Sequence, residues 1–176
     1  MSKPIRWTEA ALTVALREKY QPPTFAFLPQ VADGTGSNKS RTADAIVMGL
    51  WPSRGLDIIG FEIKVSRSDW LQELKKPAKA ESIARFCDQW YVVVADVGIV
   101  KDGELPSAWG LMAPRGNGKL WTHKEAPMKE AEPITRRFLA AILRNAACWT
   151  VPKVEIDSAA VARAHADGRR DGDQAR

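Results

Sequence analysis

Cysteine and histidine are scarce in this chain of 176 residues, which contains two of each. Cys87 and Cys148 lie in separate apolar stretches and are too few for a disulfide framework, so we interpret both as buried reduced thiols. Neither His123 nor His165 has cysteine or histidine partners at metal-binding spacing. The sequence therefore does not support a zinc site or a Ser-His catalytic triad.

Long apolar runs are also absent. No run approaches the roughly 18 residues of a membrane-spanning helix, and the first residues contain no apolar stretch typical of a secretion signal, so we expect a cytoplasmic protein. Hydrophobic residues make up 45% of the chain, which is enough for one core and predicts a single domain over residues 1–150. Residues 151–176 are rich in Ala, Asp, Gly and Arg and are predicted to form a polar, frayed or disordered tail.

Acidic residues are outnumbered by basic ones, and the formal net charge is +5. The predicted tail contains five basic and five acidic residues, so the whole excess lies in residues 1–150. Basic side chains gather near the middle of the chain, between Lys39 and Arg85. This distribution permits a polyanionic partner such as DNA but does not require one.

Apolar periodicity and turn residues predict an α/β (α+β) fold, in which helices flank a mixed sheet. Pro29 places the first strand at a sheet edge, and the apolar run over residues 90–95 is typical of a central strand. The element order is αβββαβ, followed by a hairpin and a closing helix. The predicted helices cover residues 8–20, a segment that Ser66 or Ser68 caps and that restarts at Pro77, and 133–148. The predicted strands cover residues 25–31, 43–50, 56–65, 90–95, 108–113 and 119–123.

Three ionisable residues stand in the predicted hairpin over residues 43–65. Asp44 opens its first strand, while Glu62 and Lys64 lie two positions apart on the second and therefore project from one face. Their neighbours are mostly apolar, and burying an unpaired charge costs on the order of several kcal/mol. Two carboxylates can hold a hard cation such as Mg²⁺, beside which the Lys64 ammonium would position or activate a water. This pattern favours phosphodiester hydrolysis.

The same residues also allow a structural explanation. Glu62 and Lys64 would then form a cross-strand salt bridge on a solvated face, and Asp44 would cap its strand or pair with Arg41. The apolar residues around them favour the functional interpretation.

The spacing of Asp44 and the triplet Glu62-Ile63-Lys64 resembles the PD-(D/E)xK nuclease superfamily. The sequence is most similar to the MmcB-related DNA repair proteins and their phage-borne relatives, over about residues 1–96. The matching stretches are Arg41-Thr42-Ala43-Asp44, residues 62–70 and residues 87–91. Ala43 stands where the name of the superfamily implies proline.

This resemblance implies a restriction-endonuclease-like fold and an Mg²⁺-dependent DNA endonuclease of DNA repair or phage DNA processing, with Mn²⁺ as an alternative ion. Asp44 and Glu62 would hold the metal, Lys64 would complete the catalytic set, and Glu9 on the first helix would be an outer ligand. The alternative is a non-catalytic DNA-binding or assembly protein on the same fold. The oligomeric state stays open, a dimer included.

DNA contacts are expected from basic and aromatic residues near the predicted site. The basic residues would contact phosphates, and Trp70 would stack on a base. The candidates are Arg41, Arg67, Trp70, Lys75, Lys76 and Lys79. In the alternative interpretation the lysines form a solvated helix face and Trp70 belongs to the core.

Overall fold

The computed structural model describes residues 6–75, 78–116 and 118–150. The chain divides into two units, Met1–Ala146 and Ala147–Arg176, and the predicted tail lies outside the described residues. The helices are α1 (Glu9–Lys19), α2 (Arg67–Leu74), α3 (Ala78–Ala84) and α4 (Arg136–Thr150), with 3-10 turns η1 (Gly36–Asn38), η2 (Pro52–Arg54) and η3 (Val97–Ile99). The strands are β1 (Phe25–Ala32), β2 (Thr42–Gly49), β3 (Ile58–Lys64), β4 (Gln89–Val94), β5 (Trp109–Pro114) and β6 (Leu120–Lys124).

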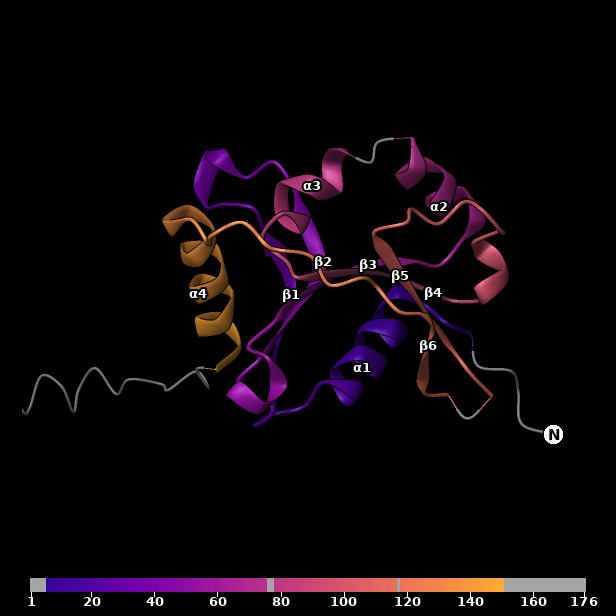
Figure 1. Cartoon of the computed structure of the whole chain (residues 1–176), viewed down its shortest axis with the longest axis horizontal. Helices are drawn as coiled ribbons and strands as arrows, with labels where there is room; N and C mark the ends of the chain where they lie inside the picture. The colour runs from indigo at the N-terminus through magenta and orange to yellow at the C-terminus, as the bar shows by residue number, and fades with distance from the viewer. Residues whose placement is uncertain (1–5, 76–77, 117, 151–176) are drawn as a thin grey trace, which may run out of the picture. The chain divides into compact units, whose positions relative to one another are not determined.

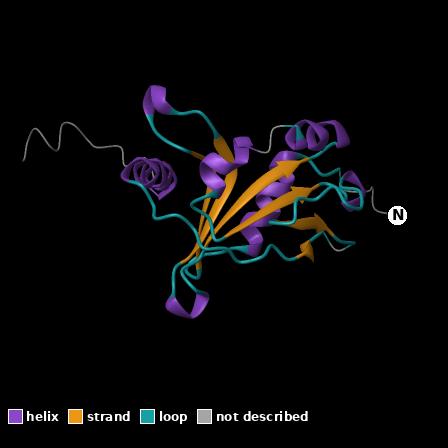
Figure 2. Cartoon of the chain, turned by 45° about the horizontal axis from the view of Figure 1, so that its top comes forward, coloured by secondary structure: helices purple, strands orange, loops and turns teal. Residues whose placement is uncertain are grey.

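The six strands form one mixed sheet in the order β1-β2-β3-β4-β5-β6 (Figure 1). β1, β2 and β3 are antiparallel neighbours, β3, β4 and β5 run parallel, and β6 is antiparallel to β5. Helices flank this sheet (Figure 2), so the predicted α+β fold and its element order are confirmed. β1, which contains Pro29, is an edge strand and β4 is an interior strand, both as predicted. No helix within the described ranges is long and apolar enough to cross a membrane.

Side-chain caps fix where three of the helices begin. The hydroxyl of Thr8 accepts from Ala11 N at 3.2 Å and starts α1, and the hydroxyl of Ser66 accepts from Asp69 N at 3.2 Å and starts α2. The Thr135 hydroxyl accepts from Phe138 N at 3.2 Å, which is why α4 begins at Arg136 and not at the predicted residue 133.

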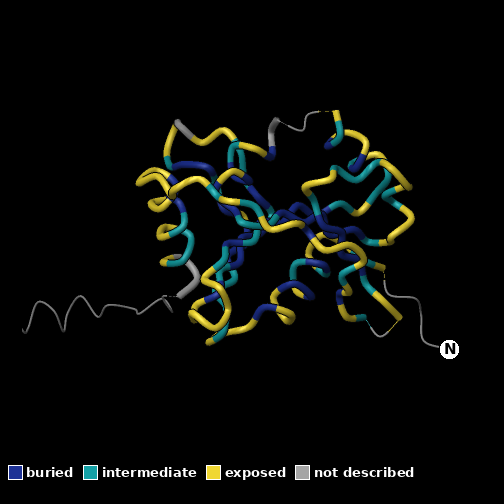
Figure 3. The backbone as a smooth tube through the Cα atoms, viewed as in Figure 1, coloured by how far each residue is buried: buried dark blue, intermediate teal, exposed yellow. Residues whose placement is uncertain are grey.

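The sheet has an apolar core on each face. Leu12 and Leu16 of α1 pack with Phe61 and Ile63 on one face. The other face is covered by α3 and α4, whose residues form a second cluster with Ile58. Figure 3 shows the central strands as buried. Because neighbouring strand residues point to opposite faces, Glu62 and Lys64 are directed away from the α1 core that holds Ile63.

Gly60 of β3 allows the close approach of the strand that follows it in the sheet. A Cβ atom at this position would lie 2.2 Å from ring atoms of Trp90, which is buried and cannot move aside freely. We predict that Gly60→Ala lowers the free energy of unfolding by about 1–3 kcal/mol, as overpacked cores do. Urea denaturation measures this loss. Gly116→Ala is the control, since nothing lies within 4 Å of its Cβ position, and an equal loss in both variants would contradict the prediction.

Candidate functional site

The sheet opens between β2 and β3 at one end. The pairing of β2 with β3 ends at Ala45 and Phe61, whereas β2 stays paired with β1 as far as Thr42 and β3 stays paired with β4 as far as Lys64. The two halves of the sheet therefore separate at the residues that the sequence marked as candidates.

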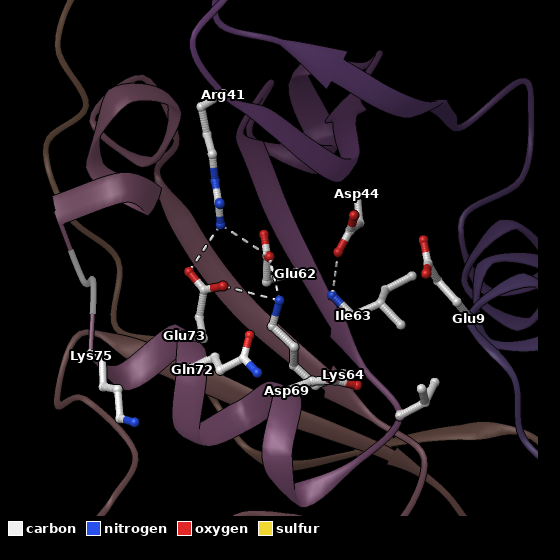
Figure 4. Close-up of a pocket in the computed structure, with 11 residues that line it drawn as sticks. Glu9, Arg41, Asp44, Glu62, Ile63, Lys64, Asp69, Gln72, Glu73 and Lys75 are labelled. Atoms are coloured by element: carbon white, nitrogen blue, oxygen red, sulfur yellow. Dashed lines mark hydrogen bonds and ion pairs between the residues drawn. The ribbon is translucent and has the colours of Figure 1, made fainter.

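A cavity of about 660 Å³ lies at this opening (Figure 4). Its walls come from β2, β3, α1 and α2, and it contains five acidic and three basic residues. The lining residues are Glu9, Arg41, Asp44, Glu62, Ile63, Lys64, Val65, Asp69, Gln72, Glu73 and Lys75. With every acid and base ionised, the lining carries a formal charge of −2, so the cavity favours cations over anions.

Asp44 spans the gap between the separated strands. Its Oδ2 accepts a hydrogen bond from the backbone N–H of Ile63 at 2.7 Å, and its Oδ1 accepts one from Gln30 Nε2 at 3.3 Å. The carboxylate thus replaces the β2 partner that Ile63 lacks, because a buried N–H must be paired. Asp44 reaches the cavity from β2, beside Glu62 of β3, as predicted.

Four side chains form a closed ring of ion pairs in this cavity (Figure 4). The Glu62 Oε1 atom lies 2.6 Å from Lys64 Nζ and 3.1 Å from Arg41 Nη2. Glu73 joins the same two cations from α2, with distances of 3.0 Å to Lys64 Nζ and 2.9 Å to Arg41 Nη2. Positive and negative groups alternate around the ring, so each charge has two neighbours of opposite sign.

This ring is buried, unlike the solvated salt bridge of the structural explanation. The side chains of Glu62 and Glu73 are 6% and 7% exposed, and that of Lys64 is 13% exposed. One oxygen, Glu62 Oε2, is buried and finds no hydrogen-bond partner among the described residues. A buried carboxylate oxygen without a protein partner costs free energy, so a water or a cation is expected to satisfy it.

The two glutamates differ in electrostatics. Burial, followed by the negative charge of Asp44, raises the pKa of Glu62 to about 7, although Lys64 opposes this shift. Burial also acts to raise the pKa of Glu73, but the Lys64 and Arg41 hydrogen bonds and charges outweigh it and lower that pKa. Burial acts to lower the pKa of Lys64, and both glutamates outweigh it, so the pKa of the ammonium is raised.

Glu73 is a member of the ion-pair ring that the sequence did not predict. On α2, the apolar Leu71 is 39% exposed whereas the acidic Glu73 is buried. Glu73 lies three positions after the fully buried Trp70, at the spacing that places both on one face of a helix. A carboxylate at a buried helical position was the signal that could have revealed it.

Two of the predicted DNA contacts have structural partners instead. Trp70 is completely buried and its indole N–H donates to Glu104 at 3.2 Å, so its predicted stacking on a base is wrong. Arg67 also pairs with Glu104 and donates to the Ile99 carbonyl at 2.8 Å, which holds the start of α2 against the loop after β4. The Arg67 side chain is still 33% exposed, so its predicted phosphate contact stays a prediction.

The other candidates have different outcomes. Arg41 faces the cavity, but its charge is shared between Glu62 and Glu73. Lys75 is exposed and lines the cavity rim, while Lys76 and the side chain of Lys79 lie outside what the structure describes. Glu9 lines the cavity from α1, as its role as an outer ligand requires.

Cys87 is not among the residues that line the cavity. Cys87 is a buried free thiol, as predicted, and burial raises its pKa to about 12, so it is unreactive at neutral pH. The side chain of Cys148 lies outside the described residues.

The side chains around Asp44 and Glu62 fit a hard divalent cation. Mg²⁺ prefers oxygen ligands, keeps several waters and is typically held by one or two carboxylates. The unpartnered Glu62 Oε2 and the acidic excess of the cavity are the features that such an ion would satisfy. Within the described ranges, no group of three or more His, Cys, Asp or Glu side chains has the geometry of a metal site.

Comparisons with known proteins show a similarity in fold. No protein-family model and no curated protein matches this chain. Among solved structures, the chain is similar to the SPO1766 protein of unknown function from Silicibacter pomeroyi, with a TM-score of 0.54 and 22% sequence identity. The match covers 78% of this chain and 82% of that chain. At this identity the similarity shows a shared fold alone.

Glu62 should make the stability of the protein depend on pH. Its pKa is about 7 in the folded state and about 4.5 in the unfolded chain, so the folded state holds the proton more tightly between these values. The free energy of unfolding should therefore fall as pH rises from 5 to 8, by roughly 3 kcal/mol from this group. Urea denaturation at both pH values should show a smaller fall in Glu62→Gln than in the parent.

The control for this measurement is Glu130→Gln, at an exposed glutamate outside the cavity. It should keep the pH dependence of the parent. A contradicting result would be a Glu62→Gln variant that has the pH dependence of the parent and is less stable than the parent at pH 8. Glu62 would then act mainly as the counter-ion of Lys64 and Arg41.

Proposed function

We propose that this protein is an Mg²⁺-dependent DNA endonuclease of the PD-(D/E)xK type, with Asp44, Glu62 and Lys64 as catalytic residues. The observation that carries the proposal is the arrangement of these three side chains in one cavity at the opening of the sheet, where a Glu62 oxygen is buried without a partner. The motif spacing and the restriction-endonuclease-like order of elements support the same conclusion.

Asp44 and Glu62 would hold the ion. When bound, Mg²⁺ would offset the acidic lining and stabilise the negative charge that develops on the scissile phosphate. Mn²⁺ would serve in the same place because it also accepts carboxylate and water oxygens. Asp44 is well suited to this role, since its two hydrogen bonds fix its orientation while each oxygen keeps a further lone pair.

Lys64 would act as a fixed positive charge and not as a base. Its pKa is raised by Glu62 and Glu73, so it stays protonated at neutral pH. The two glutamates hold its Nζ at 2.6 Å and 3.0 Å, which aims the ammonium into the cavity. There it would orient the attacking water and stabilise the developing charge, while Glu73 and Arg41 keep it in position.

DNA would approach this cavity only with cations present. The formal charge of −2 repels phosphate, whereas the exposed Lys75 at the rim attracts it. We therefore expect divalent ions to strengthen DNA binding as well as to permit cleavage. We place this activity in the cytoplasm, in DNA repair or phage DNA processing.

One observation favours the non-catalytic alternative. The ion-pair ring gives Lys64 two carboxylate partners within the protein, so its buried charge can be explained without a catalytic role. A protein of this kind would bind DNA on the same fold without cutting it. A DNA cleavage assay separates the two functions, because only the nuclease would turn over its substrate.

Removal of the Lys64 charge should abolish most of the cleavage. We predict that purified parent protein cuts DNA in Mg²⁺ or Mn²⁺ and that Lys64→Met lowers the rate by about 10²- to 10³-fold, the usual effect of losing one electrostatic donor. Gel assays on duplex, single-stranded and branched DNA measure this. Lys124→Met, at an exposed lysine of β6, is the control and should cut at the parent rate.

The same assay has an outcome that would refute catalysis. If the parent cuts none of these substrates with either ion, yet binds DNA, the binding alternative replaces the nuclease. Cleavage that survives in Lys64→Met at the parent rate would instead indicate a contaminating nuclease.

Reversal of the charge at the cavity rim should weaken DNA binding. In Ca²⁺, which occupies oxygen sites, Lys75→Glu should lower affinity for a short duplex and reduce the slope of log affinity against log salt by about 1 or more. Fluorescence anisotropy at several salt concentrations measures both quantities. Lys124→Glu makes the same charge change away from the cavity, and an equal loss in both variants would mean that net charge alone controls binding.

A further inference from the structure

Gln30 has an unusual backbone conformation for a strand residue. It lies in edge strand β1 with a φ of 54°, in the left-handed region that glycine favours. The pairing of β1 with β2 skips it: Pro29 pairs with Ala45 and Val31 pairs with Ala43, which leaves Gln30 opposite Asp44. Strain of this kind persists only where the surrounding structure enforces it, and it concentrates at functional sites.

The left-handed residue is aimed at the candidate metal ligand. The Gln30 amide donates to Asp44 Oδ1 at 3.3 Å, while the Ile63 N–H donates to the other oxygen of that carboxylate. These two donors approach Asp44 from neighbouring strands on either side of it, so the carboxylate cannot rotate without breaking one of them.

A third element holds Gln30 in place. Asn145 of α4 donates from Nδ2 to the Pro29 carbonyl at 2.7 Å and to the Gln30 carbonyl at 3.4 Å. α4 thus covers the exposed edge of the sheet at the strained residue. A series of hydrogen bonds therefore links Asn145 of α4, through Gln30 of β1, to the Asp44 carboxylate in the cavity.

We propose that Gln30 is a positioning residue for Asp44, and that Asn145 acts through it by holding the left-handed backbone. This inference rests on the proposed function, because its effect on chemistry passes through metal binding at Asp44. Gln30 touches neither substrate nor metal in this role. It fixes the direction in which Asp44 presents its free lone pairs, as outer partners of metal ligands commonly do.

Gln30→Gly separates positioning from folding. Glycine accepts a φ of 54° without strain, so the variant should be at least as stable as the parent, although it lacks the amide. Its affinity for Mg²⁺, measured from the metal-induced rise in melting temperature without DNA, should fall about tenfold.

Leu56→Gly is the matched control, because Leu56 also has a left-handed φ, of 59°, but it precedes β3 at the end of that strand opposite to the cavity. It should keep the Mg²⁺ affinity of the parent. Asn145→Ala alone should weaken Mg²⁺ binding. Combined with Gln30→Gly, it should cause no further loss of Mg²⁺ affinity, because the two residues act in series.

The outcomes distinguish the two proposals. A parent whose melting temperature does not respond to Mg²⁺ overturns both the proposed function and the role of Gln30. A parent that responds, together with a Gln30→Gly variant of unchanged affinity, overturns only the positioning role. An equal loss of affinity in Leu56→Gly would also overturn it.

Discussion

The hydrogen bond from Ile63 N to Asp44 Oδ2 is the interaction on which the rest of the site depends. β2 leaves β3 at this point to follow β1, and an unpaired buried N–H on β3 would be costly. A carboxylate can accept from this N–H and still offer lone pairs and a negative charge to the cavity. The same contact therefore pairs the backbone N–H that the sheet leaves without a partner, and it places a negative charge where the two strands separate.

The charges in the resulting cavity hold one another in position because they are arranged in a ring. Replacing a buried ion pair with apolar residues is often neutral or stabilising, whereas removing one partner is expensive. The ring of Arg41, Glu62, Lys64 and Glu73 is therefore a poor way to gain stability but a good way to hold charged groups in fixed positions. Glu62 differs from Glu73 because burial, followed by the negative charge of Asp44, raises its pKa.

Several residues that look like nucleic-acid contacts in the sequence instead hold the site together. Glu104 accepts from both Arg67 and Trp70, which fixes the start of α2 and thereby the position of Glu73 at its end. Arg41 lies in the loop before β2 and orients two glutamates. The remaining cation of the cavity that faces solvent is Lys75, so the described surface near the opening is less basic than the sequence suggests.

The sequence by itself determined the fold class, the order of elements and three of the site residues. Alternation along a strand requires that Glu62 and Lys64 share a face. The caps at Thr8 and Ser66 mark where helices begin. Both effects act between residues that are close in the chain. Only the tertiary structure decided that Glu73 is buried, that Trp70 is covered and that Gln30 faces Asp44. Each of those outcomes depends on contacts between distant segments, which local periodicity does not encode.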